Sequence, residues 1–357
     1  YRTIFPIPLG EAAAWDPAAV ERAAAVAAAE AAAAGVKWTF APMLDIARDP
    51  RWGRIAEGSG EDPYLGTVLG AARVRGFQGA DPAARDKVLA TAKHWVGYGA
   101  AEGGRDYNST DISEHALRTV YLPPFKAAID AGAATVMSAF NDLNGVPSSA
   151  DRRTLTGILR EEWGFDGLVV SDYTSIAELV NHGAAADGAD AARRALTAGV
   201  DMEMVSRLYN EHGKSLPKAE VDEAVRRVLR AKFRAGIFER PFADEQAEAA
   251  LPTAAFRAEA RAMAVNSMVL LENRGVLPLS KETKTLAVLG PLADSKADLL
   301  GSWTGDGRAE DAPSIREAIA AAVPGVRLVD DAAAAEAAVV VVGETADLSG
   351  EAASRSE

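Results

Sequence analysis

Asp172 is the residue with the clearest chemical potential in this sequence. It follows a short apolar run, 168–170, which turn-forming glycines at positions 164 and 167 precede. Such a run predicts a strand buried on both faces, as in parallel sheets and barrels. Asp172 then falls at the carboxyl end of that strand, the edge that carries the chemistry in these folds. Asp172 is therefore a functional candidate, and the alternative is that it caps the next helix or pairs with a neighbouring cation.

Further polar and aromatic residues follow the other predicted strands. The set consists of Asp45, Asp49, Arg51, Arg54, Lys93, His94, Arg105 and Glu203, with Trp52, Trp95, Tyr98, Tyr107, Phe140 and Tyr173 interleaved. Hydroxyl groups of a sugar need such hydrogen-bonding partners, and its CH faces pack on aromatic rings. A sugar pocket is therefore predicted. Structural alternatives stay open: Arg51 or Arg54 can pair with Asp49 or Glu57, and Lys93 with His94 can form a structural ion pair.

Two of the acids in this set are expected to stay ionised. Asp45 and Asp49 lie near arginines in the sequence, and a neighbouring cation lowers the pKa of a carboxyl group. Both would then be poor proton donors.

Other chemistries lack their sequence signatures. The chain has no cysteine and four histidines without metal-ligand spacing, so neither a thiolate nor a histidine-rich metal site is predicted. No nucleophile elbow, phosphate-binding loop or dinucleotide fingerprint is present. We therefore predict no cofactor and no metal.

Composition limits the class of partner. The 357 residues are 48% apolar and 25% charged, as in an ordinary soluble globular protein, and are enough for two domains. A net charge of -13 argues against a nucleic-acid surface, which needs a basic face. No apolar run reaches membrane-spanning length, so no membrane partner is predicted.

Strands alternate with helices along the first two thirds of the chain. Strands are predicted at 36–44, 88–91, 134–139, 168–170 and 199–204. Helices are predicted between them, two of them beginning at Asp16-Pro17 and Asp62-Pro63 and a third with a capping box of Asp111 and Glu114. This alternation predicts a parallel sheet, and the number of units favours a closed (β/α)8-type TIM barrel.

The character of the sequence changes near residue 238. A polar, proline-containing stretch follows, then a helix at about 255–273 and two apolar strands at 286–289 and 338–342 with a helix at 314–322 between them. We predict a barrel domain at 1–240 with a truncated N-terminus, a linker at 241–252, and an incomplete α/β sandwich domain at 253–357.

Several long motifs, in order, carry a family resemblance. They are Tyr1 to Gly10, Ala41 to Asp45, Arg48 to Arg54, Gly58 to Pro63, Ala92 to His94, Asn144-Gly145, Gly164 to Asp172 and Ser349 to Arg355. On these motifs the whole chain resembles the glycoside hydrolase family 3 β-glucosidases of the bacterial periplasmic type. The tryptophan after His94 and the residues that follow it differ from the β-N-acetylglucosaminidase subfamily.

The resemblance implies roles for particular residues. Asp172 matches the catalytic nucleophile and Glu351 the general acid/base, while Arg54, Lys93 and His94 match positions that hold the sugar. Tyr107 and Phe140 match positions that line the subsite. An aspartate that grips the sugar in relatives precedes the matched region, so the resemblance places it outside this sequence.

The implied activity is that of a retaining exo-acting β-glycosidase, first of all a β-glucosidase that hydrolyses terminal non-reducing β-D-glucosyl residues by double displacement. The alternatives are a β-xylosidase or another β-glycosidase of the family, and a non-catalytic carbohydrate-binding relative. Implied partners are an oligosaccharide or aryl β-glycoside, with a homodimer left open. The implied location is periplasmic or secreted.

Overall fold

A parallel sheet forms the centre of the first part of the chain. The computed structural model describes residues 2–355, so that Tyr1, the first residue of one motif, lies outside the described residues. The strands β1 (Thr91–Trp95), β2 (Thr135–Ser138), β5 (Leu168–Tyr173) and β6 (Met202–Met204) pair in that order, all parallel. The segment 38–43 extends the sheet through parallel bridges of Trp38 to Leu89 and Met43 to Lys93.

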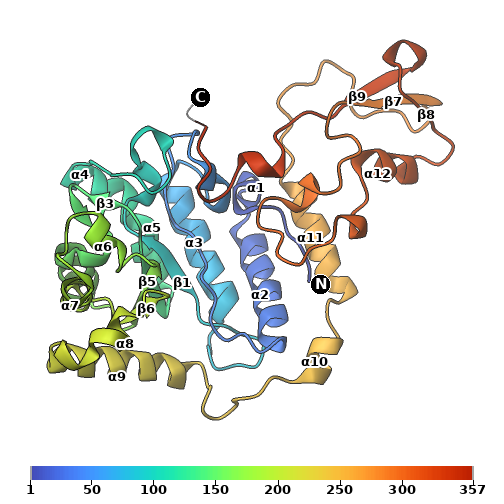
Figure 1. The fold of residues 1–357 in the computed structure, drawn as a ribbon. Helices are drawn as coiled ribbons and strands as arrows, with labels where there is room; N and C mark the ends of the chain where they lie inside the picture. Colours follow the sequence, from blue (N-terminus) through green and yellow to red (C-terminus); the bar gives the residue numbers. More distant parts are fainter. Residues whose placement is uncertain (1, 356–357) are drawn as a thin grey trace.

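Helices cover this sheet on its outer side (Figure 1). The longer ones are α2 (Pro17–Ala33), α3 (Pro63–Gln78), α5 (Pro123–Asp130), a π-helical stretch Arg153–Glu162, α7 (Gly188–Ala198) and α9 (Lys218–Arg234). The shorter elements are α1 (Pro8–Ala13), α4 (Glu114–Ala116), α6 (Glu178–Asn181), α8 (Leu208–His212) and a hairpin of β3 (Asp142–Leu143) and β4 (Val146–Pro147). The parallel strands with helical crossovers confirm the predicted α/β barrel architecture.

Two predicted helix starts are confirmed with their chemistry. Asp16 accepts a hydrogen bond from the Ala19 N–H, and Asp62 accepts one from the Leu65 N–H. A proline follows each aspartate at the first helical position, where its missing N–H costs nothing.

Some predicted boundaries are wrong. The capping box predicted from Asp111 does not form, because Ser113 caps α4 by accepting from the Ala116 N–H. The strand predicted at 88–91 lies later, as β1, so Lys93 and His94 are inside a strand and not after it. The strand predicted at 36–44 is only a pair of isolated bridges, and the helix predicted to residue 273 ends at Asn266.

The main core lies between the sheet and its helices. Val136 and Val169 are fully buried in neighbouring strands, and Trp95 packs edge-on against Phe125 of α5 and Trp163. Each fully buried side chain of this size contributes about 1.5 to 3 kcal/mol to stability. Strands built on so much burial are rigid, which fixes the polar groups at their carboxyl ends.

The later part of the chain contains a second, smaller parallel sheet. The strands β7 (Thr285–Leu289), β8 (Arg327–Val329) and β9 (Ala337–Val340) pair in the order β8-β7-β9, with α12 (Ile315–Ala322) in the crossover. This arrangement confirms the second α/β unit. Two helices precede it, α10 (Glu245–Ala249) and α11 (Ala254–Asn266), and α11 packs on the barrel through buried Met263 and an ion pair of Glu259 with Arg22.

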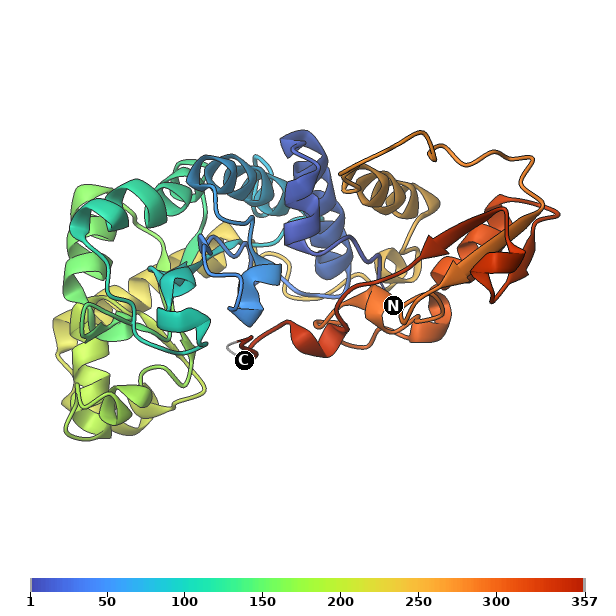
Figure 2. The ribbon, with the colours of Figure 1, turned by 90° about the horizontal axis from the view of Figure 1, so that it is seen from above.

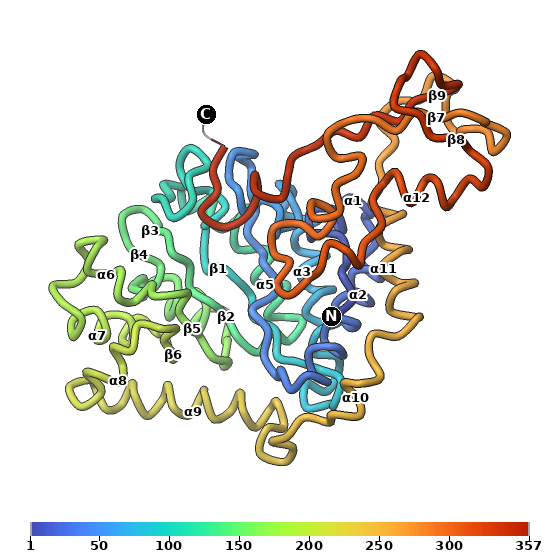
Figure 3. Tube along the Cα trace, turned by 45° about the vertical axis from the view of Figure 1, so that its right-hand side comes forward, coloured from blue at the N-terminus to red at the C-terminus, as the bar shows by residue number. Residues whose placement is uncertain are grey.

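The final segment returns from the second sheet to the barrel. After β9 the chain runs back to the barrel, so that residues 350–355 lie beside the loop 51–53 and the loop 104–106 that follows β1 (Figures 2 and 3). This return places Glu351 over the barrel. No helix among residues 2–355 is long and apolar enough to cross a membrane.

Candidate active site

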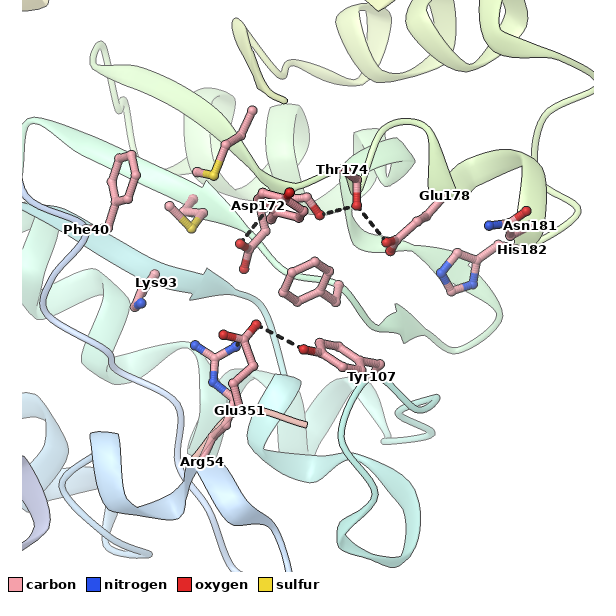
Figure 4. A pocket seen from close by; sticks show the side chains of 14 residues that line it. Phe40, Arg54, Lys93, Tyr107, Asp172, Thr174, Glu178, Asn181, His182 and Glu351 are labelled. Atoms are coloured by element: carbon pink, nitrogen blue, oxygen red, sulfur yellow. Dashed lines mark hydrogen bonds and ion pairs between the residues drawn. The ribbon is translucent and has the colours of Figure 1, made fainter. Parts of the chain in front are cut away.

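One pocket collects six of the seven residues to which the family resemblance gives roles. It has a volume of about 720 Å³ and lies at the carboxyl ends of the barrel strands (Figure 4). Its described lining consists of Phe40, Arg54, Lys93, Tyr107, Met137, Phe140, Asp172, Tyr173, Thr174, Glu178, Asn181, His182, Met204 and Glu351. The seventh, His94, is not in the described lining, since it lies behind Arg54 and Asp172 with 1% of its surface exposed. The lining also lacks eight members of the predicted polar and aromatic set: Asp45, Asp49, Arg51, Trp52, Trp95, Tyr98, Arg105 and Glu203.

Asp172 lies near the end of β5 with its carboxylate directed into the pocket (Figure 4). Its Oδ1 accepts a hydrogen bond from the Tyr173 N–H at 2.7 Å, while the buried Oδ2 has no hydrogen-bond partner in the described structure. Burial raises the pKa of Asp172 to about 6, against the lowering effect of the Tyr173 N–H, Arg54 and Lys93. One carboxylate oxygen is thus held by the backbone, and the other is buried without a hydrogen-bond partner.

The tautomer of His94 leaves that second oxygen without a hydrogen bond. The Arg54 Nη2 lies 3.0 Å from the His94 Nε2, and an arginine only donates, so Nε2 must accept. The ring proton is then on Nδ1 and is donated to Asp45 Oδ2 at 2.8 Å. Burial holds the pKa of His94 well below its ordinary value. The Nε2 lies 3.5 Å from Asp172 Oδ2, so two lone pairs face each other there.

Asp45 departs from the sequence prediction. Its neighbouring arginine was expected to keep it ionised, but burial dominates and raises the pKa of Asp45 to about 7. The Asp45 Oδ2 accepts from both the backbone and the ring of His94, and the buried Oδ1 has no partner in the described structure. Asp45 therefore orients His94 and does not reach the pocket lining. For Asp49 the expectation is confirmed, since hydrogen bonds from Arg51 lower its pKa.

Arg54 is fixed by a buried, two-pronged ion pair. Its Nε and Nη2 donate to the two carboxylate oxygens of Glu57 at 2.7 and 3.1 Å. Although burial opposes the charge, these bonds raise the pKa of Arg54 above its ordinary value. The guanidinium also lies 5.5 Å from the centre of the Tyr98 ring. Arg54 therefore forms the ion pair with Glu57 that the sequence left open as a structural alternative, and it also lines the pocket.

Lys93 is held more loosely than Arg54. Its Nζ lies 3.9 Å from Glu57 Oε2, longer than a hydrogen bond, and burial lowers the pKa of Lys93, an effect that Arg54 reinforces and Glu57 and Asp172 oppose. The ammonium group lines the pocket beside Asp172 (Figure 4). A cation with this freedom can donate to a ligand hydroxyl group.

We expect Lys93→Ala to lower kcat/KM for a glycoside by about 100-fold, because a charge-assisted hydrogen bond to a buried ligand is worth a few kcal/mol. Steady-state kinetics would measure this loss. Lys126→Ala removes an exposed lysine that pairs with Asp130 on α5 and serves as the matched control. Unchanged kinetics in Lys93→Ala would show that Lys93 has only a structural role.

Glu351 reaches the pocket from the returning terminal segment. Tyr107 donates its hydroxyl proton to Glu351 Oε1 at 3.1 Å, and the Arg54 Nη1 lies 3.5 Å from the same oxygen (Figure 4). Tyr107 in turn stacks edge-on with buried Phe140 at 5.0 Å between ring centres. Burial is the main cause of the raised pKa of Asp172, and the negative charge of Glu351 raises it further. The two carboxylates are therefore close enough to interact electrostatically.

Glu203, another acid of the predicted polar set, lies outside the pocket lining. Glu203 accepts the backbone N–H groups of Leu208 and Tyr209 at 2.8 Å each, at the start of α8, and does not line the pocket. Residues on and next to α6 do line it, and none of these was predicted from the sequence: Thr174, Glu178, Asn181 and His182. Their position directly after the Asp172 strand was the signal available, since loops at the carboxyl ends of barrel strands form the site in this fold.

No group of three or more His, Cys, Asp or Glu residues that could hold a metal ion occurs within residues 2–355. The pocket offers carboxylates, cations and aromatic rings. A sugar-sized ligand with hydroxyl groups fits this set of donors and acceptors.

The fold and the pocket define an α/β-barrel protein whose pocket is lined by three carboxylates, Asp172 and Glu178 from the barrel and Glu351 from a following α/β unit. The family model for the glycosyl hydrolase family 3 N terminal domain matches residues 1–231, and the model for the glycosyl hydrolase family 3 C-terminal domain matches residues 268–357. The chain belongs to glycosyl hydrolase family 3.

The relatives of this chain include proteins named as β-glucosidases and proteins named as β-xylosidases. The chain is 45% identical over 339 residues to a periplasmic β-glucosidase of Salmonella typhimurium, an alignment that covers 90% of this chain and 44% of the relative. It is 37% identical over 322 residues to a β-xylosidase of Formosa agariphila, covering 84% of this chain and 44% of that relative. The chain thus spans less than half the length of these relatives.

A solved structure agrees over the whole chain. The β-glucosidase from Listeria innocua in complex with glucose is 39% identical, with a TM-score of 0.95. The alignment covers 100% of this chain and 53% of that chain.

Proposed function

We propose that the protein is a retaining exo-acting β-glycosidase that removes terminal non-reducing β-D-glucosyl residues. The observation that carries this proposal is the pair of Asp172, whose buried Oδ2 has no hydrogen-bond partner in the described structure, and Glu351, both on the wall of one pocket. Asp172 attacks the anomeric carbon while Glu351 protonates the departing oxygen. Glu351 then takes a proton from water, which attacks the same carbon and releases the sugar with its configuration retained.

The two carboxylates have the different environments that these roles need. Asp172 is 8% exposed, hydrogen-bonded on one oxygen only and next to two cations, which suits a nucleophile that must be ionised and oriented. The Glu351 side chain is 30% exposed, on a segment that contributes only this residue to the described pocket lining. Solvent and the leaving group can both reach it there, as proton transfer requires.

The ring of the sugar is held by the cations and the aromatic wall. In the proposal Arg54 and Lys93 donate to its hydroxyl groups, His94 supports Arg54 from behind, and Phe140 with Tyr107 packs against its CH face. An oligosaccharide or aryl β-glycoside fits this arrangement. The relative from Listeria innocua, whose structure contains glucose, supports a glucosyl unit here.

The identity of the sugar is tested with a panel of nitrophenyl β-glycosides assayed on the full-length protein. We expect the β-glucoside to be hydrolysed with the highest kcat/KM, and NMR of the first product to show the β-anomer. Faster hydrolysis of the β-xyloside would favour a β-xylosidase, as the relative from Formosa agariphila is named. Binding without turnover of any glycoside would favour a non-catalytic carbohydrate-binding protein.

We also propose the domain division 1–240, 241–252 and 253–357, with α11 as the helix through which the second unit packs on the barrel. The family models, which end at residue 231 and resume at 268, support a boundary in this region. A periplasmic or secreted location is proposed from the name of the Salmonella typhimurium relative. Whether a homodimer forms can be measured by light scattering.

A further inference from the structure

The segment 350–355 is held on the barrel loop 51–53 by backbone hydrogen bonds. The Gly53 N–H donates to the Ala353 carbonyl at 2.9 Å, and the Gly350 N–H donates back to the Gly53 carbonyl at 2.8 Å. Trp52 and Ser354 form an antiparallel bridge next to this pair. Glu351 therefore lies in a turn between Gly350 and Ala353, both of which are hydrogen-bonded to Gly53, the residue before Arg54.

Gly53 leaves room for these backbone hydrogen bonds because it has no side chain. A Cβ atom at this position would fall far inside contact distance of the carbonyl oxygens of Gly350 and Ala353. Both are backbone atoms, which cannot rotate away as a flexible side chain can. Gly53 has no positive φ, so alanine suits its own backbone, and the clash would fall on the segment that carries Glu351.

A second contact holds the same segment from the other side. The Ala352 N–H donates to Asp106 Oδ2 at 2.6 Å, while Asp106 Oδ1 accepts from Trp52 Nε1 at 2.8 Å and from the Tyr98 hydroxyl. Trp52 and Tyr98 are fully buried, so Asp106 is anchored to a rigid base. The next residue, Tyr107, donates to Glu351 itself.

We propose that Gly53 is a positioning residue for the acid/base: its missing side chain lets 350–355 pair with the loop 51–53, and this pairing, with Asp106, holds Glu351 over Asp172. The proposal rests on the role of Glu351 proposed above. Loss of the pairing removes proton transfer by Glu351 while Asp172, on β5, stays in place. Substrates that need no acid to expel their leaving group are then attacked as before.

The first test measures the pairing without any assay of activity. Hydrogen–deuterium exchange of the full-length protein compares wild type, Gly53→Ala and Gly157→Ala. Gly157 lies in the helical stretch Arg153–Glu162, where an added Cβ atom would have nothing within 4 Å, so it is a matched control. We expect exchange in 350–355 to rise about tenfold or more in Gly53→Ala only, since the backbone hydrogen bonds between this segment and the loop 51–53 are lost. Unchanged exchange in that segment would overturn the proposal.

The second test measures the catalytic consequence. For Gly53→Ala we expect kcat/KM to fall about 100-fold on cellobiose, whose leaving group needs protonation, and less than about fivefold on a dinitrophenyl glucoside. Equal losses on both substrates would contradict a positioning role. Asp106→Asn, which keeps the shape but loses one acceptor, is the second variant and is expected to show the same difference.

Glu351→Ala measured alongside separates this proposal from the proposed function. If Glu351→Ala shows the leaving-group difference and Gly53→Ala does not, the positioning role of Gly53 is wrong and the acid/base assignment stands. If wild type hydrolyses neither substrate, the proposed function fails, and the exchange experiment still decides whether Gly53 docks the segment.

Discussion

Replacing Asp172 with asparagine is expected to lower kcat by at least about 10⁴-fold, the scale of loss seen when a covalent nucleophile is removed. The amide oxygen is a poor nucleophile, so no glycosyl ester forms. The barrel should remain folded, because Asp172 lies at a strand end and asparagine can still accept the Tyr173 N–H bond through Oδ1. Kinetics and circular dichroism measure the two outcomes.

The same substitution should change stability with pH. Burial raises the pKa of folded Asp172 to about 6, from an ordinary value of 3.8. Between these pH values the folded protein keeps a proton that the unfolded chain has lost, so stability decreases as pH rises through this window. The charge costs roughly 3 kcal/mol of stability above it. Asp172→Asn should therefore raise Tm near pH 7.5 and have less effect near pH 4.

Activity should follow ionisation of the same group. The nucleophile must be unprotonated, so kcat/KM is expected to fall as pH drops below about 6. Asp222→Asn, at an exposed carboxylate paired with Lys218 on α9, is the control for both pH effects. A 2-fluoroglucoside with a good leaving group should label Asp172, as read by peptide mass spectrometry. Labelling of any other residue would show that the nucleophile is elsewhere.

Replacing Glu351 with alanine should slow hydrolysis of the glycosyl-enzyme for every substrate, and should slow its formation only when the leaving group needs a proton. With cellobiose we expect kcat/KM to fall by about 10²- to 10⁴-fold, the usual contribution of a general acid. With a dinitrophenyl glucoside, attack by Asp172 needs no acid, so the glycosyl-enzyme forms and accumulates. Both kcat and KM should be low for that substrate, since water is no longer activated.

Azide provides the decisive measurement on Glu351→Ala. It needs no general base and is small enough for the space that the side chain leaves, so it should restore turnover and yield β-glucosyl azide. Glu203→Ala is the comparison, because Glu203 binds the backbone of α8 and not the pocket. Rescue seen in Glu203→Ala and not in Glu351→Ala would move the acid/base role into the barrel.

Local sequence patterns determined the elements of this protein and the strand end that bears Asp172. The aspartate-proline pairs that begin α2 and α3, and the apolar runs that became β2, β5 and β7, act within a few residues. Their outcome depends on propensity, capping and burial of adjacent side chains, all of which a sequence displays. Element ends were less secure, as the shift of β1 onto Lys93 and His94 shows, because pairing with a distant strand decides them.

Tertiary structure alone decided the state of the charged groups and the position of Glu351. Asp45 has an arginine nearby in the sequence, but its burial, with a pKa raised to about 7, comes from segments far along the chain. Glu351 lies 297 residues after Arg54 and meets it only because 350–355 pairs with 51–53. Desolvation and long-range pairing depend on the whole packed chain, and no local pattern encodes them.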